Sequence, residues 1–136
     1  MIEQLFRLSD YFQYLIKARG RHGIHSPFVY QFIENVLLAK NEVATFHAVE
    51  HVRQSMLKSK SILEYEDLGP GNNSGKRSLN KLVARTARQA KYGRLLYYLI
   101  KNNNYKNVLE LGTGTGITAL YQAIALDENA NFVSIE

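Results

Sequence analysis

One short segment near the C-terminal end limits the fold more than any other: Val108-Leu109-Glu110-Leu111-Gly112-Thr113-Gly114-Thr115-Gly116-Ile117. It begins with an apolar strand pattern, passes through an acid and continues with three glycines at alternate positions. This pattern, followed by a helical one, predicts a tight strand-to-helix turn. Glycine suits such a turn because it adopts positive φ angles without strain and lets a ligand approach the backbone. The segment therefore predicts an α/β unit with a polar ligand at its turn.

The residues around this turn complete the unit. A strand is predicted at 107–111, a helix at 116–126 and a second strand at 131–135. Two strands joined by a helix form a right-handed unit with parallel strands. The chain before residue 104 is mainly helical by pattern. We therefore predict an α/β fold with a helical region at 1–103 and a βαβ unit at 104–136.

The helical prediction for the N-terminal region begins with apolar residues at a period near 3.6 in residues 2–18. Gly20 and Gly23 end that helix. Ser26-Pro27 then restarts a helix, with Ser26 as the N-cap and the proline at the first helical position. The apolar face predicted for this second helix comprises Phe28, Val29, Phe32, Ile33, Val36 and Leu37.

Two further helices are predicted before the strand, at 45–59 and at 78–102. Any break in the second of them is expected near Tyr92-Gly93. A loop is predicted at 65–75, which holds Gly69-Pro70-Gly71-Asn72-Asn73.

Composition excludes several classes of protein. The chain has 136 residues, 46% of them hydrophobic, which is typical of a single globular domain rather than a disordered protein. It has no cysteine, so it forms no disulfide and no thiolate metal site. It shows neither a signal-peptide pattern nor an apolar run long enough to cross a membrane. We therefore expect a cytoplasmic protein with no membrane partner.

The net charge of +5 is unevenly distributed. Residues 1–105 hold 16 basic and 8 acidic residues, whereas residues 106–136 hold 1 and 4. The spacing of Arg77, Lys81, Arg85 and Arg88 predicts one basic helical face. Such a face is usually solvated, but it also suits nucleic-acid phosphates. One hypothesis is therefore a helical module that binds nucleic acid or protein.

Three other patterns are weaker. Residues 69–76 resemble a P-loop, but Pro70 stands where a glycine is required and Arg77 follows Lys76. His47-Ala48-Val49-Glu50-His51 matches a zinc-peptidase pattern that needs a third ligand from elsewhere, and no downstream signature supplies one. His22 and His25 flank a turn, where they either make structural hydrogen bonds or line a substrate pocket. We predict no metal site.

Two classes of protein place glycines between a strand and a helix. Dinucleotide enzymes use G-x-G-x-x-G/A, which Gly114–Ala119 fits, but Gly112-Thr113 then separate the strand from the first glycine. Starting from Glu110, the pattern is E-x-G-x-G-x-G. It resembles motif I of the class I S-adenosylmethionine-dependent methyltransferases, and the segment KNVLELGTGTGITALYQA resembles their O-methyltransferase-like members.

This resemblance implies a Rossmann-like sheet and a set of cofactor contacts. An acid at the end of the second strand, here Glu136, accepts hydrogen bonds from the ribose hydroxyls in this family, as a carboxylate readily does. Glu110 is implied near the methionine end of the cofactor, often through water. The segment Tyr92–Leu99 resembles a family helix with a Gly-x-Leu-Leu sequence that packs beside the cofactor, and the segment His22–Phe28 resembles an N-terminal extension of a bacterial subgroup. The predicted cofactor-binding residues are Glu110, Gly112, Thr113, Gly114, Gly116, Glu136, Tyr92 and Gly93.

The resemblance covers residues 91–136, and the family's further strands, with the substrate pocket and catalytic residues, are not in this sequence. We therefore expect the chain to be the N-terminal part of a methyltransferase for a small-molecule acceptor, and to be inactive alone. A fragment that binds NAD or a nucleotide, and glycines that only tighten a turn, remain alternatives. A pair of parallel strands has open edges and apolar faces that are unfavourable in water. We therefore also predict that the chain's own helices cover the apolar strand residues, or that these residues cause self-association or aggregation. They are Val108, Leu109, Leu111, Phe132, Val133 and Ile135.

Overall fold

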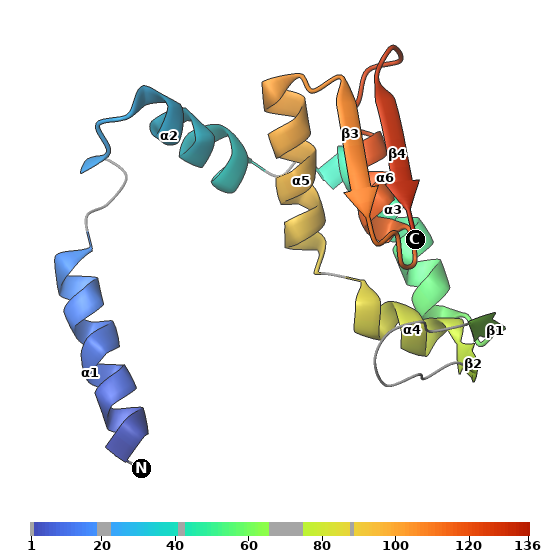
Figure 1. Ribbon diagram of the computed structural model, residues 1–136, viewed down its shortest axis with the longest axis horizontal. Coiled ribbons are helices and arrows are strands. Elements are labelled where there is room, and N and C mark those ends of the chain that lie inside the picture. Colours follow the sequence, from blue (N-terminus) through green and yellow to red (C-terminus); the bar gives the residue numbers. More distant parts are fainter. Residues whose placement is uncertain (1, 19–22, 41–42, 66–74, 88) are drawn as a thin grey trace.

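The computed structural model describes residues 2–18, 23–40, 43–65, 75–87 and 89–136. Its helices and strands are mixed along the chain (Figure 1). The helices are α1 (Ile2–Lys17), α2 (Pro27–Phe32), the π-helix η2 (Ile33–Leu37), α3 (Val43–Lys58), α4 (Leu79–Thr86), α5 (Ala90–Asn103) and α6 (Ile117–Ala123). The strands are β1 (Ile62–Tyr65), β2 (Gly75–Ser78), β3 (Asn107–Leu111) and β4 (Asn131–Ile135).

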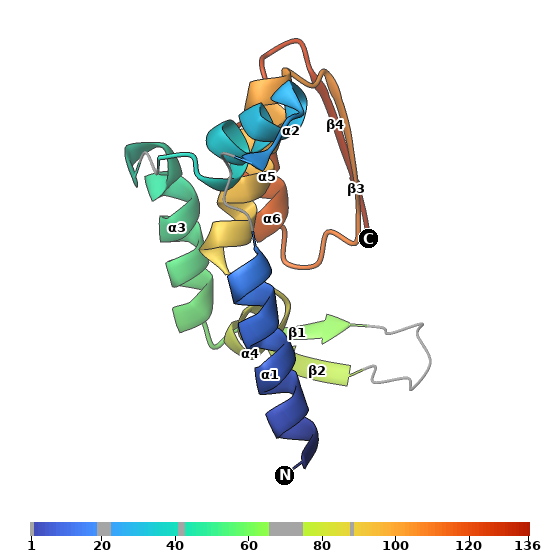
Figure 2. The same ribbon diagram turned by 90° about the vertical axis from the view of Figure 1, so that its left-hand side faces the viewer.

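The two C-terminal strands form a parallel pair joined through α6. Their register sets Asn107 opposite Asn131 and Leu111 opposite Ile135. Both strands have the bounds that the sequence predicts, and the parallel direction is confirmed. Figure 2 shows α5 and α6 between these strands and α3. The fold is therefore a mixed helix and strand structure in which β3 and β4 lie against helices on one side.

The hydrophobic core joins the helical region to the parallel strands. Its buried side chains come from α3 to α6 and the residues just after α6, and they are Phe46, Val49, Val83, Tyr97, Ile100, Ile117, Tyr121 and Ala125. The Phe46 ring meets the Tyr97 ring edge to face, with centroids 5.0 Å apart. Val108 of β3 packs against this cluster. One core therefore extends across residue 103, where the sequence suggests a boundary.

The predicted helix at 78–102 is broken at a different place from the one expected. It is divided into α4 and α5 at Ala87, whose extended ψ of 118° ends α4, and the expected break at Tyr92-Gly93 is wrong. Gly93 is instead buried inside α5, where the Tyr121 ring packs directly on its backbone. The glycine therefore provides close helix packing instead of a break.

An antiparallel hairpin precedes α4. Strands β1 and β2 pair from Ile62 opposite Ser78 to Tyr65 opposite Gly75. The sequence predicts a loop over 65–75, so these two short strands were missed; residues 66–74 lie outside the described residues. Because Arg77 lies in β2, the predicted basic face on one helix is also wrong. Only Lys81 and Arg85 of that set lie on α4, and Arg88 is outside the described residues.

The N-terminal helices bury little of their apolar surface. The predicted cap is confirmed, because the Val29 N–H donates to Ser26 Oγ at 3.4 Å. Of the apolar face predicted for this second helix, however, only Val36 is buried. Leu8, Phe12 and Ile16 of α1 are exposed, and Figure 1 shows α1 standing apart from the core helices. In the described part of the chain no helix is both long and apolar enough to cross a membrane.

The outer face of the parallel strands is apolar and uncovered. Side chains alternate along both strands, so Val108 and Phe132 turn toward the helices and are partly buried. The outer face carries Leu109, Leu111, Val133 and Ile135, each more than half exposed. The chain's own described helices therefore cover only one side of this sheet. Exposed apolar sheet surface of this kind favours association.

We predict that the chain self-associates through this outer face. Leu109 and Val133 are register partners, so Leu109→Glu with Val133→Lys places a cross-strand ion pair there. We expect the double variant to raise the dissociation constant for self-association by about tenfold or more, equivalent to about 1.4 kcal/mol. Light scattering over a concentration series measures this. A chain that stays monomeric at every concentration contradicts the prediction.

Candidate cofactor site

The glycine turn that follows β3 has the backbone conformation that its sequence requires. Gly112, Gly114 and Gly116 have φ angles of 85°, 56° and 74°. Residues other than glycine rarely adopt such φ angles, because their Cβ atom crowds the backbone. Apart from the glycine and its two chain neighbours, no heavy atom lies within 4 Å of a Cβ atom built at any of the three. The glycines therefore shape the turn and leave open space beside it.

That open space is a cavity of about 620 Å³ at the carboxyl end of β3. This volume is within the range of pockets that hold small ligands. The segments that line the cavity are the end of β3, the glycine turn, the start of α6, the end of α4 and Glu136. Its lining residues are Arg85, Thr86, Ala87, Glu110, Leu111, Gly112, Thr113, Gly114, Thr115, Ile117, Thr118 and Glu136.

The acid at the end of the second strand lies against the turn. The Gly114 N–H donates a hydrogen bond of 2.5 Å to Glu136 Oε2. The neighbouring Gly112 N–H donates to the Ile135 carbonyl oxygen at 2.7 Å, which extends the pairing of the strands by one residue. Two features that are 22 residues apart in the sequence therefore meet at one edge of the sheet. The carboxylate of Glu136 has a second oxygen left to accept hydrogen bonds.

The other acid, Glu110, is held by a chain of hydrogen bonds. Ser134 Oγ donates to Glu110 Oε2 at 2.6 Å, and Gln122 Nε2 donates to Glu110 Oε1 at 2.7 Å. Because Ser134 has only one hydroxyl proton, the 2.6 Å contact between Thr113 Oγ1 and Ser134 Oγ uses the threonine as donor. Glu110 is thus fixed as an acceptor on the inner face of the sheet.

Ser134 and Gln122 were not identified from the sequence. Ser134 is the register partner of Glu110 across the two strands. Pairing the predicted strands 107–111 and 131–135 side by side, from their first residues, sets Glu110 opposite Ser134. Gln122 is 7% exposed within α6 and contacts Glu110 only because α6 packs on the strands. No pattern in the sequence indicates that contact.

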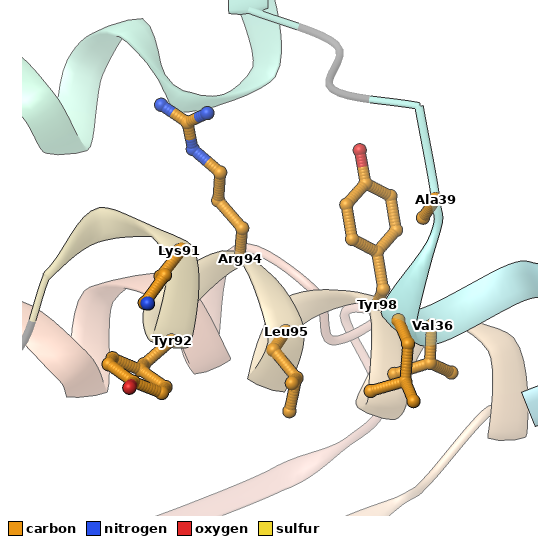
Figure 3. Close-up of a pocket in the computed structure, with 8 residues that line it drawn as sticks. Val36, Ala39, Lys91, Tyr92, Arg94, Leu95 and Tyr98 are labelled. Carbon is orange, nitrogen blue, oxygen red and sulfur yellow. The ribbon is translucent and has the colours of Figure 1, made fainter. Parts of the chain in front are cut away.

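The structure does not bring Tyr92 and Gly93 to this cavity. Tyr92 lines a separate cavity of about 330 Å³ between α5 and η2 (Figure 3). There the Lys91 ammonium lies 4.9 Å from the centre of the Tyr92 ring, while Arg94 and Tyr98 extend together from α5. Gly93 meets the Tyr121 ring in the core. The helix α5 therefore supports α6, and its Tyr92-Gly93 pair does not line the space beside the glycine turn.

The helix that follows the glycine turn is anchored by Tyr121. The Tyr121 hydroxyl donates to Glu50 Oε1 of α3, and Glu50 Oε2 lies 3.5 Å from Arg53 Nη1. Burial of the phenol, together with the hydrogen bond to Glu50, raises the pKa of Tyr121 from 10.0 to about 12. The neutral phenol is therefore the form that the folded chain favours.

The raised pKa predicts a loss of stability at high pH. Because the folded pKa lies above the unfolded one, the contribution of Tyr121 is complete below about pH 10 and declines between about pH 10 and 12. We expect the free energy of unfolding of Tyr121→Phe to fall less steeply across this window, as measured by urea titration at each pH. Tyr105→Phe, which removes an exposed hydroxyl, is the matched control. Equal slopes for Tyr121→Phe and the unaltered chain refute this prediction.

The remaining sequence motifs form no second site among the described residues. His47 and His51 of the zinc-peptidase pattern are exposed on α3, and Glu50 between them bonds to Tyr121. No group of three or more His, Cys, Asp or Glu within the described ranges could hold a metal. Lys76 of the P-loop-like segment pairs with Glu64 at 2.7 Å. His25 is exposed, whereas His22 and residues 69–74 lie outside the described residues.

Comparisons with models of known families, with curated proteins and with solved structures find no match for this chain. The glycine turn and its two acids are therefore the features of this chain that point to a function.

Proposed function

We propose that this chain carries the cofactor-binding unit of a class I S-adenosylmethionine-dependent methyltransferase. The observation that supports this proposal best is the hydrogen bond from the Gly114 N–H to Glu136, because it brings the acid at the end of β4 to the glycine turn. If the E-x-G-x-G-x-G motif and the acid after the second strand bind one cofactor, they must lie close together. On this proposal, β3, α6 and β4 are the first βαβ unit of a Rossmann-like sheet.

The residues at the turn fit this cofactor. Three glycines with open space at their Cβ positions allow close approach of a ligand to the backbone. Glu136 offers carboxylate oxygens for the two ribose hydroxyls, which a bidentate acceptor can bind together. Glu110, held by Ser134 and Gln122, places negative charge near the cationic end of the cofactor. An acid at each position suits a ligand with hydroxyls and a positive charge.

The cofactor supplies an activated methyl group on a sulfonium, so the protein's task is to orient it toward an acceptor. This chain's own residues would contribute binding and orientation: Glu136 fixes the ribose, and the Thr113–Ser134–Glu110 chain keeps the second acid in place. We propose a small-molecule acceptor. The catalytic residues of the complete enzyme are not assigned to this chain.

Calorimetric titration of the 136-residue chain with a set of cofactors tests the proposal. We expect saturable binding of S-adenosylmethionine and S-adenosylhomocysteine, and none of NAD or ATP at the same concentrations. Glu136→Gln keeps the side-chain shape and removes the charge, so we expect it to weaken binding by about tenfold, as for loss of a charge-assisted hydrogen bond. Preference for NAD would favour a dinucleotide-binding unit, and binding of neither class overturns the proposal.

A further inference from the structure

The cavity beside the glycine turn has one cationic side chain among its described lining residues. Arg85 lies in the last turn of α4 and lines the cavity with its neighbours Thr86 and Ala87. The other charged lining residues are the acids Glu110 and Glu136. The sequence pattern predicts Arg85 on a basic helical face and gives it no role in cofactor binding.

Arg85 belongs to a well-anchored element, although its side chain is exposed. Val83, two residues earlier on α4, is fully buried in the core at 0% exposure. The backbone of α4 is thereby held in place beside the turn, although 27 positions of sequence separate Arg85 from Gly112. Among the described residues, no acid forms an ion pair with Arg85. Arg85 is exposed and lines the cavity, so a ligand there can reach its guanidinium.

The charges of the cavity match a ligand with separate positive and negative groups. Its two acids already accept hydrogen bonds within the chain: Glu110 from Ser134 and Gln122, and Glu136 from Gly114 through one of its two oxygens. A guanidinium binds a carboxylate through two parallel hydrogen bonds, which an ammonium cannot do. The amino-acid end of S-adenosylmethionine carries one carboxylate. Of the described charged lining side chains, only Arg85 complements it.

We propose that Arg85 binds the carboxylate of the cofactor's amino-acid end and makes the cavity selective for ligands that carry this group. The inference rests on the proposed function, because it concerns the same ligand in the same cavity. It assigns Arg85 a binding role that lies outside the glycine motif. The binding site then consists of two parts: the βαβ unit for the ribose end, and the end of α4 for the carboxylate.

A pair of ligands isolates this contact. S-adenosylhomocysteine has the amino-acid end, whereas 5′-methylthioadenosine keeps the adenosine and the sulfur without it. We expect Arg85→Ala to weaken binding of S-adenosylhomocysteine by about tenfold or more and to leave binding of 5′-methylthioadenosine unchanged. Calorimetric titration measures both affinities. Arg85→Lys keeps the charge and loses the planar guanidinium, so its affinity for S-adenosylhomocysteine should lie between those of the unaltered chain and Arg85→Ala.

Lys81→Ala is the matched control, because Lys81 is an exposed cation of α4 that does not line the cavity. We expect it to change neither affinity. If Arg85→Ala leaves S-adenosylhomocysteine binding unchanged, or weakens both ligands equally, the inference is overturned and the proposed function stands. If the unaltered chain does not bind S-adenosylhomocysteine at all, the proposed function and this inference are both overturned.

Discussion

Gly114→Arg is expected to remove detectable binding of S-adenosylhomocysteine while the chain remains folded. Gly114 has a φ of 56° and open space where a side chain would extend. An arginine there fills the part of the cavity next to Glu136 and strains the turn, at a cost of about 1–2 kcal/mol. We expect affinity to fall by about 100-fold or more, equivalent to about 2.7 kcal/mol, in calorimetric titration.

Gly75→Arg is the control for Gly114→Arg. Gly75 also has a positive φ, of 156°, and open space at its Cβ position, but it lies in β2 and does not line the cavity. Gly75→Arg adds the same side chain and charge away from the cavity, so the affinity for S-adenosylhomocysteine should be unchanged. Circular dichroism shows whether each variant is folded. Retained binding by a folded Gly114→Arg variant would exclude the glycine turn as the cofactor site.

Gly93→Ala is expected to destabilise the chain by about 2–3 kcal/mol, as overpacking of a core does. A Cβ atom at Gly93 would lie 2.3 Å from Cδ2 of the Tyr121 ring, so the ring or one of the two packed helices must shift. Helix propensity alone favours alanine over glycine by about 1 kcal/mol, so the clash must outweigh that gain. Urea unfolding of the unaltered chain and the variant measures the difference.

A double-mutant cycle identifies the ring as the cause. In a Tyr121→Val background the ring atoms that meet the new methyl group are absent, so Gly93→Ala should cost much less or become slightly stabilising. Lys91→Ala, at an exposed position of the same helix, should change stability by no more than about 0.5 kcal/mol. The same cost for Gly93→Ala in both backgrounds would show that α5 and α6 do not meet at Tyr121.

The parallel strands could be predicted from the sequence because their local pattern and their tertiary environment agree. Short apolar runs, the glycines after β3 and the polar residues before β4 all mark the same bounds. The positive φ angles at Gly112, Gly114 and Gly116 follow from the same argument, since glycine alone adopts them without strain. Where only local chemistry decides the structure, the prediction was confirmed.

Other features depend on contacts between distant segments, and the sequence pattern does not contain them. Gly93 looks like a helix breaker in isolation, but the Tyr121 ring needs the space that its missing side chain leaves. Arg77 fits a helical spacing, but its pairing with Leu63 places it in the hairpin. Ser134, Gln122 and Arg85 reach the candidate site only through strand register and helix packing.

We propose that the cavity beside the glycine turn binds S-adenosylmethionine. Nuclear magnetic resonance of the uniformly ¹⁵N-labelled 136-residue chain during titration with S-adenosylhomocysteine tests this binding residue by residue. We predict saturable shifts of backbone amide signals at Glu110–Thr118 and Glu136, with smaller shifts at the end of α4 and none at Tyr92 or Tyr98 of the second cavity. Shifts confined to that second cavity, or no shifts at any residue, would contradict binding at the glycine turn.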